Sequence, residues 1–532
     1  KVEVENLSEG PLEFEIIDGL PAIIPFGIDD AAYKAVGNTL KSWMDVFNLE
    51  NSIPYYRVRS STNDSAEVEE VSKGHFYLSF DDEGQLIKPI VDAELIFGSN
   101  SSLSYPDEFE KVSIKELLAA EPVTSNKVPC GFSGLSKVLE QGAKLSFHTL
   151  IGHVKDIEII NEKAADIKAG GYMDRKYEEA QSLVTEITKD VETKTASPLF
   201  DAYVNQSYLD NVLRGGYPIE LESDDSAFTY YVFSRKHGDL ERDYNFFSLA
   251  PEYFSQGNGN FRDVNQNRRN DVFFHPETGD YNIKLFMSLI QADGYNPLVV
   301  KGASFELRDQ SDWAWLGELV PLQKDADFIK KKLSGTYTPG DLLQTISDSD
   351  IQLASSLPDF LKTVLSRSSQ NIEAEFGEGY WMDHWTYNLD LVENYLKVYP
   401  ENKAQLLFDD YGYKYFHSPV FVNPRSDKYV LANGKVRQYD AITEFGHQKE
   451  SNWVRKPDGE FFTSNLYSKL FSLVLLKFST LDPYGMGVEM EANKPGWNDS
   501  MNGLPGIFGS AMSETLELKR LLEFVISSGE AG

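Results

Sequence analysis

The pattern of apolar and polar positions changes near residue 155 of this 532-residue chain. Before that point, apolar residues alternate with polar ones in short runs that Gly, Pro, Asn and Asp separate. A period of two is typical of β-strands with one buried face. The runs are Val2–Val4, Leu12–Ile16, His75–Phe80, Glu94–Phe97 and Lys144–Leu150. We therefore predict an antiparallel β-sandwich over residues 1–155.

Helical spacing replaces this alternation from residue 156 onward. Residues 156–195 are rich in Glu, Lys, Asp and Ala, and they carry apolar residues three or four positions apart, which predicts a helical linker. These residues are Tyr177, Ala180, Val184, Ile187 and Val191. Residues 196–532 then contain helical segments near 281–292, 326–333, 356–367, 388–398, 464–478 and 513–527. Long loops rich in aromatic, Asn, Asp and Gly residues separate them, and such loops are commonly functional.

Composition argues against several classes of partner. The 83 acidic and 50 basic residues give a net charge of −33 at pH 7, which repels nucleic-acid phosphates and anionic lipids. The longest apolar stretch, Phe471–Phe478, is shorter than the ~20 residues that a membrane span requires. The single cysteine, Cys130, allows no internal disulfide, and no signal-peptide pattern is visible. We therefore expect a cytoplasmic protein that binds neither nucleic acid nor membranes.

The segment 493–506 carries the residues best suited to catalysis. Its Pro and Gly residues interrupt the helical pattern, so Trp497 and Asp499 are expected on a connection between two helices. An indole can cover the apolar face of a sugar, and its low polarity raises the pKa of a neighbouring acid, which then keeps a proton to donate. The same composition also fits a turn with a buried Trp and an Asp that caps a helix.

Within that segment, Pro495–Asn502 reads Pro-Gly-Trp-Asn-Asp-Ser-Met-Asn. It resembles the Trp-Asn-Asp-Ala/Cys-Leu-Asn motif of glycoside hydrolase family 94, which contains cellobiose, chitobiose and cellodextrin phosphorylases. The resemblance implies that Asp499 is the general acid and that Trp497 lines the sugar subsite.

A second segment, Gly259–Asn267, resembles the Phe-Arg-Asp-Ser-Asn-Gln-Asp run of the same family. There the Arg and the acidic residues hold the hydroxyl groups of the transferred glucose. The matching positions are Arg262, Asp263, Asn265 and Gln266, whereas Asn267 stands where the family usually has Asp. An Arg–Asp pair offers several donors and a double acceptor, although it is also common as a structural ion pair.

A third segment, 377–386, resembles the Trp- and Asp-rich loop that precedes a barrel helix in this family. Trp381 and Asp383 are candidate sugar-binding residues, with Trp385 and Glu378 nearby. A loop packed on the barrel, with Asp383 near a helix N-terminus, is the alternative interpretation.

Taken together, the resemblance implies an α+β multidomain protein: a β-sandwich (1–155), a helical linker (156–195) and the N-terminal part of an (α/α)6 barrel (196–532). It implies inverting phosphorolysis of β-linked gluco-oligosaccharides to α-glucose 1-phosphate. Inorganic phosphate is the co-substrate and no cofactor is expected. The histidines show no metal-ligand spacing, so no metal is expected either.

Two rival functions and the glycosidic linkage stay open on the sequence alone. An inverting β-glucan hydrolase or transglycosylase could use Asp383 or Glu378 as base, and a non-catalytic glycan-binding relic could use the aromatic loops. The β-glucan linkage is also open, and the related family 161 acts on β-1,3-glucans. In family 94 the phosphate-binding residues follow the catalytic Asp, so we expect a C-terminal remainder or a companion chain to complete the barrel. A homodimer is compatible with the resemblance.

Overall fold

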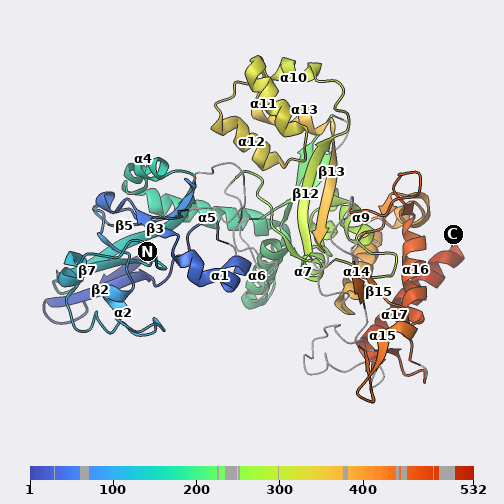
Figure 1. Cartoon of the computed structure of the whole chain (residues 1–532), viewed down its shortest axis with the longest axis horizontal. Coiled ribbons are helices and arrows are strands. Elements are labelled where there is room, and N and C mark those ends of the chain that lie inside the picture. Colours follow the sequence, from blue (N-terminus) through green and yellow to red (C-terminus); the bar gives the residue numbers. More distant parts are fainter. Residues whose placement is uncertain are drawn as a thin grey trace. The chain divides into compact units, whose positions relative to one another are not determined.

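The computed structural model shows a mixed α+β protein with several antiparallel sheets and many helices (Figure 1). It describes the whole chain except residues 29, 60–70, 225–226, 234–248, 250–251, 298, 376–381, 418–419, 439–441, 445–451, 483, 490–509 and 532. Two compact units, Lys1–Ile187 and Thr188–Gly532, are described separately below. Among the described residues there is no closed barrel, and no helix is long and apolar enough to cross a membrane.

The first unit contains two antiparallel sheets. The larger has the strand order β1 (Val2–Glu5), β8 (Lys144–Val154), β5 (Gly74–Asp81), β4 (Tyr55–Val58) and β3 (Met44–Phe47). The smaller has the order β2 (Leu12–Leu20), β7 (Gly131–Leu139) and β6 (Pro89–Ile90). Buried tyrosines join them: the Tyr56 hydroxyl donates to the Cys130 carbonyl (3.0 Å), and the Tyr77 and Ser133 hydroxyls share a 2.9 Å hydrogen bond. Four of the five predicted strands are confirmed, as β1, β2, β5 and β8.

The fifth prediction, a strand at Glu94–Phe97, is wrong, because these residues form helix α2. The Asp92 side chain accepts a hydrogen bond from the Glu94 amide (3.1 Å), and Gly98 ends the helix with a φ of 58°. Four residues are too few to separate helical from strand periodicity. Two further helices, α1 (Asp30–Lys41) and α3 (Ile114–Ala119), also lie in the region predicted as β.

Two helices follow the sheets of the first unit. In α4 (Ile157–Ile167), Ile160 and Ala164 pack on the core that Leu78 of β5 helps to form. The helix that the spacing predicts within residues 156–195 is present as α5 (Tyr172–Thr188). Its apolar stripe is not buried, however, since Tyr177 is 66% and Val184 41% exposed. The periodicity thus identified the helix correctly but not its burial.

The second unit begins with α6 (Pro198–Gly215), followed by a hairpin of β9 (Tyr217–Glu222) and β10 (Ala227–Val232). A three-stranded sheet contains β11 (Gly259–Asn260), β12 (Val299–Leu307) and β13 (Ser368–Glu375). The chain between β12 and β13 forms a helical insertion at the end of this long hairpin (Figure 1). Its helices are α10 (Ala314–Leu319), α11 (Gln323–Leu333), α12 (Pro339–Asp348) and α13 (Leu357–Leu365). These strands were not predicted, because the helical segments around them dominated the sequence pattern.

The largest core of the second unit lies among six helices. They are α7 (Phe261–Arg268), α8 (Asp271–Phe274), α9 (Tyr281–Ser288), α14 (Met382–Val398), α16 (Leu466–Phe478) and α17 (Met512–Ala531). The six helical segments predicted from the sequence are a different set from these six core helices. All of them are confirmed, as α9, α11, α13, α14, α16 and α17. The smaller elements are β14 (Tyr413–Lys414), β15 (Val420–Val422), α15 (Arg425–Lys428), β16 (Tyr429–Ala432), β17 (Lys435–Gln438), β18 (Ile442–Glu444), β19 (Thr463–Ser464), β20 (Val488–Glu489) and β21 (Ser510–Ala511).

The insertion depends on Phe305 of β12, which is fully buried among the rings of Phe228, Tyr230 and Tyr337. We predict that Phe305→Ala lowers the free energy of unfolding by ~3–5 kcal/mol, because burial is lost and a cavity remains. Phe328→Ala, in the same insertion but 49% exposed, serves as control and should change it by less than ~1 kcal/mol. Urea denaturation of both variants measures the difference. Equal losses would contradict the assignment of Phe305 to the core.

Candidate functional site

The candidate site lies where helix α7 begins. The Asn260 side chain caps this helix by accepting a hydrogen bond from the Arg262 amide (2.9 Å). Phe261 is fully buried, and its ring meets those of Phe286 and His384 edge to face, with 5.1 Å between ring centres in both cases. The cap and the buried ring fix the first turn, which leaves the next two residues nearer the surface.

These next two residues, Arg262 and Asp263, form an ion pair. The Arg262 Nε atom donates to Asp263 Oδ1 (3.2 Å), and Arg262 Nη2 lies 3.1 Å from the same oxygen. The Arg262 side chain is 13% exposed and the Asp263 side chain 44% exposed. The pair therefore presents N–H donors and carboxylate acceptors at one place, a combination that suits adjacent sugar hydroxyls.

The first turn of α14 lies against this pair. His384 and Trp385 are buried there. Burial, together with the positive charges of Arg262 and Lys477, holds the pKa of His384 well below its usual range, so His384 is neutral at pH 7. Lys477, in the last turn of α16, has its ammonium nitrogen 5.4 Å from the Trp385 ring centre and 4.7 Å from that of Tyr295. Two positive charges thus act close to one buried imidazole.

The predicted site residues fall into two groups. Arg262, Asp263, Gln266 and Asn267 share helix α7, on which Gln266 is exposed. Asn267 is buried, and its side-chain amide donates to the Asp263 backbone carbonyl at 2.6 Å. Asp383 lies in the first turn of α14, but its side chain is outside the described residues. Trp381, Trp497, Asp499 and the alternative base Glu378 are also outside them. The two motifs together predict that Arg262 and Asp499 converge on one pocket, and this stays a prediction because Asp499 lies outside the described residues.

Asn265, which also matches the second motif, lies on the inner side of α7. It is fully buried, and its Nδ2 atom donates to Oδ1 of Asn388 in α14 at 2.7 Å. Asn265 therefore joins two helices. Sequence reasoning missed Asn388, because a single Asn within a helical pattern carries no signal of its partner.

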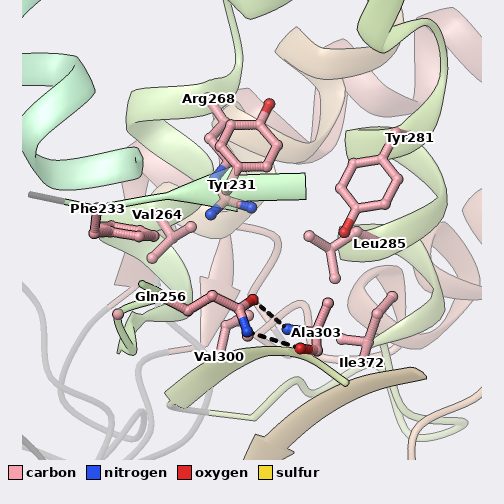
Figure 2. A pocket seen from close by; sticks show the side chains of 12 residues that line it. Tyr231, Phe233, Gln256, Val264, Arg268, Tyr281, Leu285, Val300, Ala303 and Ile372 are labelled. Atoms are coloured by element: carbon pink, nitrogen blue, oxygen red, sulfur yellow. Dashed lines mark hydrogen bonds between the residues drawn. The ribbon is translucent and has the colours of Figure 1, made fainter. Parts of the chain in front are cut away.

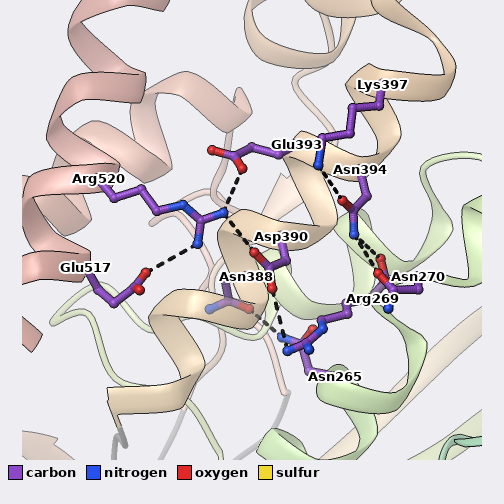
Figure 3. Close-up of polar contacts among 10 residues, drawn as sticks. All are labelled: Asn265, Arg269, Asn270, Asn388, Asp390, Glu393, Asn394, Lys397, Glu517 and Arg520. Carbon is purple, nitrogen blue, oxygen red and sulfur yellow. Dashed lines mark hydrogen bonds and ion pairs between the residues drawn. The ribbon is translucent and has the colours of Figure 1, made fainter. Parts of the chain in front are cut away.

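A network of charged side chains continues this junction toward α17 (Figure 3). Arg520 of α17 binds Asp390 Oδ1 (2.8 Å) and Glu393 Oε2 (2.7 Å), both on α14. Asp390 also lies 3.5 Å from Nη1 of Arg269, just beyond α7. The side-chain amide of Asn394 donates to the Arg269 backbone carbonyl (3.0 Å). These contacts hold α7, α14 and α17 in one arrangement.

Beyond the C-terminal end of α7, Asp271 begins the short helix α8 in a half-buried position. The Tyr231 hydroxyl donates to Asp271 Oδ2 (2.8 Å) and accepts from the Asn282 amide (2.6 Å). Burial raises the pKa of Asp271 to about 7, while the Tyr231 hydrogen bond and the charge of Arg268 oppose this shift.

Comparison with known proteins gives no family assignment, since no protein-family model and no curated protein matches the chain. The site must therefore be judged from its own chemistry. In the part of the chain that the structure describes, no three His, Cys, Asp or Glu residues are arranged to hold a metal ion. What α7 and α14 do offer is one Arg–Asp pair, nearby cationic charge and buried aromatic rings.

The Asn265–Asn388 bond can be tested by removing one partner and then both. We predict that Asn388→Leu lowers the free energy of unfolding by ~1–3 kcal/mol, because the buried Asn265 amide loses its partner. The double variant Asn265→Leu/Asn388→Leu should recover part of this loss, since no unpaired amide then remains. Gln266→Ala, on the exposed side of α7, is the control and should change little. Strictly additive losses in denaturant titrations would contradict a direct interaction.

The raised pKa of Asp271 predicts a pH dependence of stability. Its folded pKa of about 7 lies above the ordinary value of 3.8, so the folded protein holds an extra proton between these values. This contribution is complete below about pH 4 and is lost as the pH rises through 7, by roughly 2–4 kcal/mol in total. Asp271→Asn should remove it. Unfolding free energies of both proteins between pH 5 and 8 measure the difference, and parallel profiles would contradict the prediction.

Proposed function

We propose that this protein is an inverting glycoside phosphorylase that acts on β-linked gluco-oligosaccharides and releases α-glucose 1-phosphate. We further propose that its two units correspond to a β-sandwich with a helical linker and an incomplete (α/α)6 barrel. The observation that supports this best is the Arg262–Asp263 ion pair, fixed at the start of α7 beside the first turn of α14. The sequences of both segments resemble motifs of the same family.

In the proposed reaction, Asp499 gives its proton to the glycosidic oxygen while a phosphate oxygen attacks the anomeric carbon from the opposite face of the ring. The bond between that carbon and the leaving sugar breaks, and the new bond to phosphate has inverted configuration. A hydrolase would need a second carboxylate to activate water. Phosphate is already an anion, so one acid is enough.

The residues at the start of α7 would bind the transferred glucose. Arg262 and Asp263 offer a donor and an acceptor for adjacent hydroxyls, and the exposed Gln266 adds an amide. Trp497 would cover the apolar face of the ring. The charges of Arg262 and Lys477 favour a negatively charged co-substrate there, against the net charge of −33 of the whole chain.

Phosphate dependence distinguishes the proposal from its rivals. Release of glucose 1-phosphate from a panel of short β-1,2-, β-1,3- and β-1,4-glucans should require inorganic phosphate and should identify the linkage. Release of free glucose without phosphate would instead indicate a hydrolase. Saturable oligosaccharide binding without turnover, in the complete protein, would indicate a glycan-binding protein.

The role of Asp499 can be tested by Asp499→Asn in the complete enzyme. We predict a ~10²–10⁴-fold loss of rate on a natural disaccharide, because Asn cannot donate a proton to the departing oxygen. Glucosyl fluoride, whose leaving group needs little protonation, should lose much less. Asp458→Asn, in an exposed turn, is the control and should keep full activity. Equal losses on both substrates would show that Asp499 holds the sugar or the structure and is not the acid.

A further inference from the structure

A pocket lies in the second unit, beside the C-terminal half of α7 and between α9 and the strands β10 and β12 (Figure 2). It contains about 400 Å³ of empty space, part of it open to solvent. Within this space, the centre of a water-sized molecule can occupy a volume of about 20 Å³. Much of its wall is apolar, including Val264, Leu285, Val300 and Ile372. The pocket therefore has room for a small ion or molecule and few groups to solvate it.

Arg268 is the charged residue of this pocket. The side chain is buried, with the residue 7% exposed, and its guanidinium carbon lies 3.5 Å from the centre of the Tyr231 ring. The Nε atom donates to the Gly215 carbonyl (2.6 Å). Within the described residues the guanidinium makes this hydrogen bond and the ring contact, with no ion pair and no acceptor at either terminal nitrogen. Figure 2 shows these terminal nitrogens directed into the pocket.

Tyr281 of α9 provides a second donor. Its hydroxyl points into the same space, whereas the Tyr231 hydroxyl points away from it toward Asp271 (Figure 2). Among the residues drawn in Figure 2, none accepts a hydrogen bond from the Tyr281 hydroxyl. The Gln256 side chain is already occupied, because it donates to the Ala303 carbonyl and accepts from the Ala303 amide, both at 2.8 Å. Gln256 thus fixes the wall, while Arg268 and Tyr281 keep free donors.

The charge of Arg268 is only partly balanced by protein groups. Tyr231 connects Arg268 to one acid, since the guanidinium lies over its ring and its hydroxyl donates to Asp271. Because burial raises the pKa of Asp271 to about 7, this carboxyl carries a full negative charge only above neutral pH. A buried cation without a full counter-charge is unfavourable, and an anion within hydrogen-bond reach would relieve it.

We propose that this pocket binds a small monovalent anion, held by the terminal nitrogens of Arg268 and the hydroxyl of Tyr281. One guanidinium matches one negative charge, and the apolar wall disfavours a second. The site therefore suits chloride or a short carboxylate such as formate better than phosphate, which is largely doubly charged at neutral pH. It differs from the proposed sugar site, which lies at the first turn of α7.

The test compares thermal unfolding of the full chain in sodium gluconate, whose anion is too large, with added chloride, formate or phosphate. Chloride or formate should raise the midpoint saturably, as expected for a ligand of the folded state. Arg268→Met should abolish this response, and Tyr281→Phe should weaken the apparent affinity ~10-fold or more. Arg214→Met, in which an exposed ion pair of α6 is lost, is the matched control and should respond like the wild type.

Direct binding is measured by broadening of the ³⁵Cl NMR signal, with formate as competitor. Displacement of chloride by formate would support one shared site, and a response to formate alone would assign the site to a carboxylate. If Arg268→Met does not fold, the Tyr281→Phe titration decides, because removing one hydroxyl should leave the fold intact. An equal response of wild type and Tyr281→Phe, or the absence of any saturable anion effect, would overturn the proposal.

Discussion

The fixed position of α7 against α14 is the constraint on which the second unit depends. The Asn265–Asn388 hydrogen bond lies in the core, where water cannot replace either partner. A buried amide that loses its partner pays the full desolvation penalty, so even a slide of one residue along the helix is unfavourable. Outside this bond, Arg520 bridges Asp390 and Glu393, which connects α17 to α14.

Because α7 is fixed in this way, its sides serve different purposes. Successive residues of a helix are 100° apart, so neighbours in sequence point in different directions. Phe261 and Val264 face the core, and Arg262 and Asp263 pair at the first turn. Arg268 reaches a separate pocket, two turns further along. A site built on a helix that is packed on several sides is held more rigidly than one on a loop.

The buried positive charges of the second unit lie against aromatic rings and carbonyl oxygens. The chain is strongly acidic overall, yet the described part of the second unit buries two cations, Arg268 and Lys469. Arg268 lies on the Tyr231 ring at 3.5 Å, and Lys469 lies on the Tyr415 ring at 3.7 Å while donating to the Ile290 carbonyl. Aromatic faces and carbonyl oxygens attract cations without adding a buried negative charge. Such surroundings leave part of the positive charge available, as the pocket at Arg268 requires.

The sequence by itself determined the elements whose periodicity extends over several turns or strand residues. It located the helices α9, α11, α13, α14, α16 and α17, four strands of the first unit and helix α5, because period is a local property. It also indicated Arg262 and Asp263 as candidate sugar-binding residues on one segment. Only the tertiary structure showed that Glu94–Phe97 is helical, that Tyr177 stays exposed, that Asn265 faces Asn388 and that Arg268 enters a pocket. Each of these depends on contacts between residues far apart in the chain or on a local cap, and a repeating pattern carries no information about either.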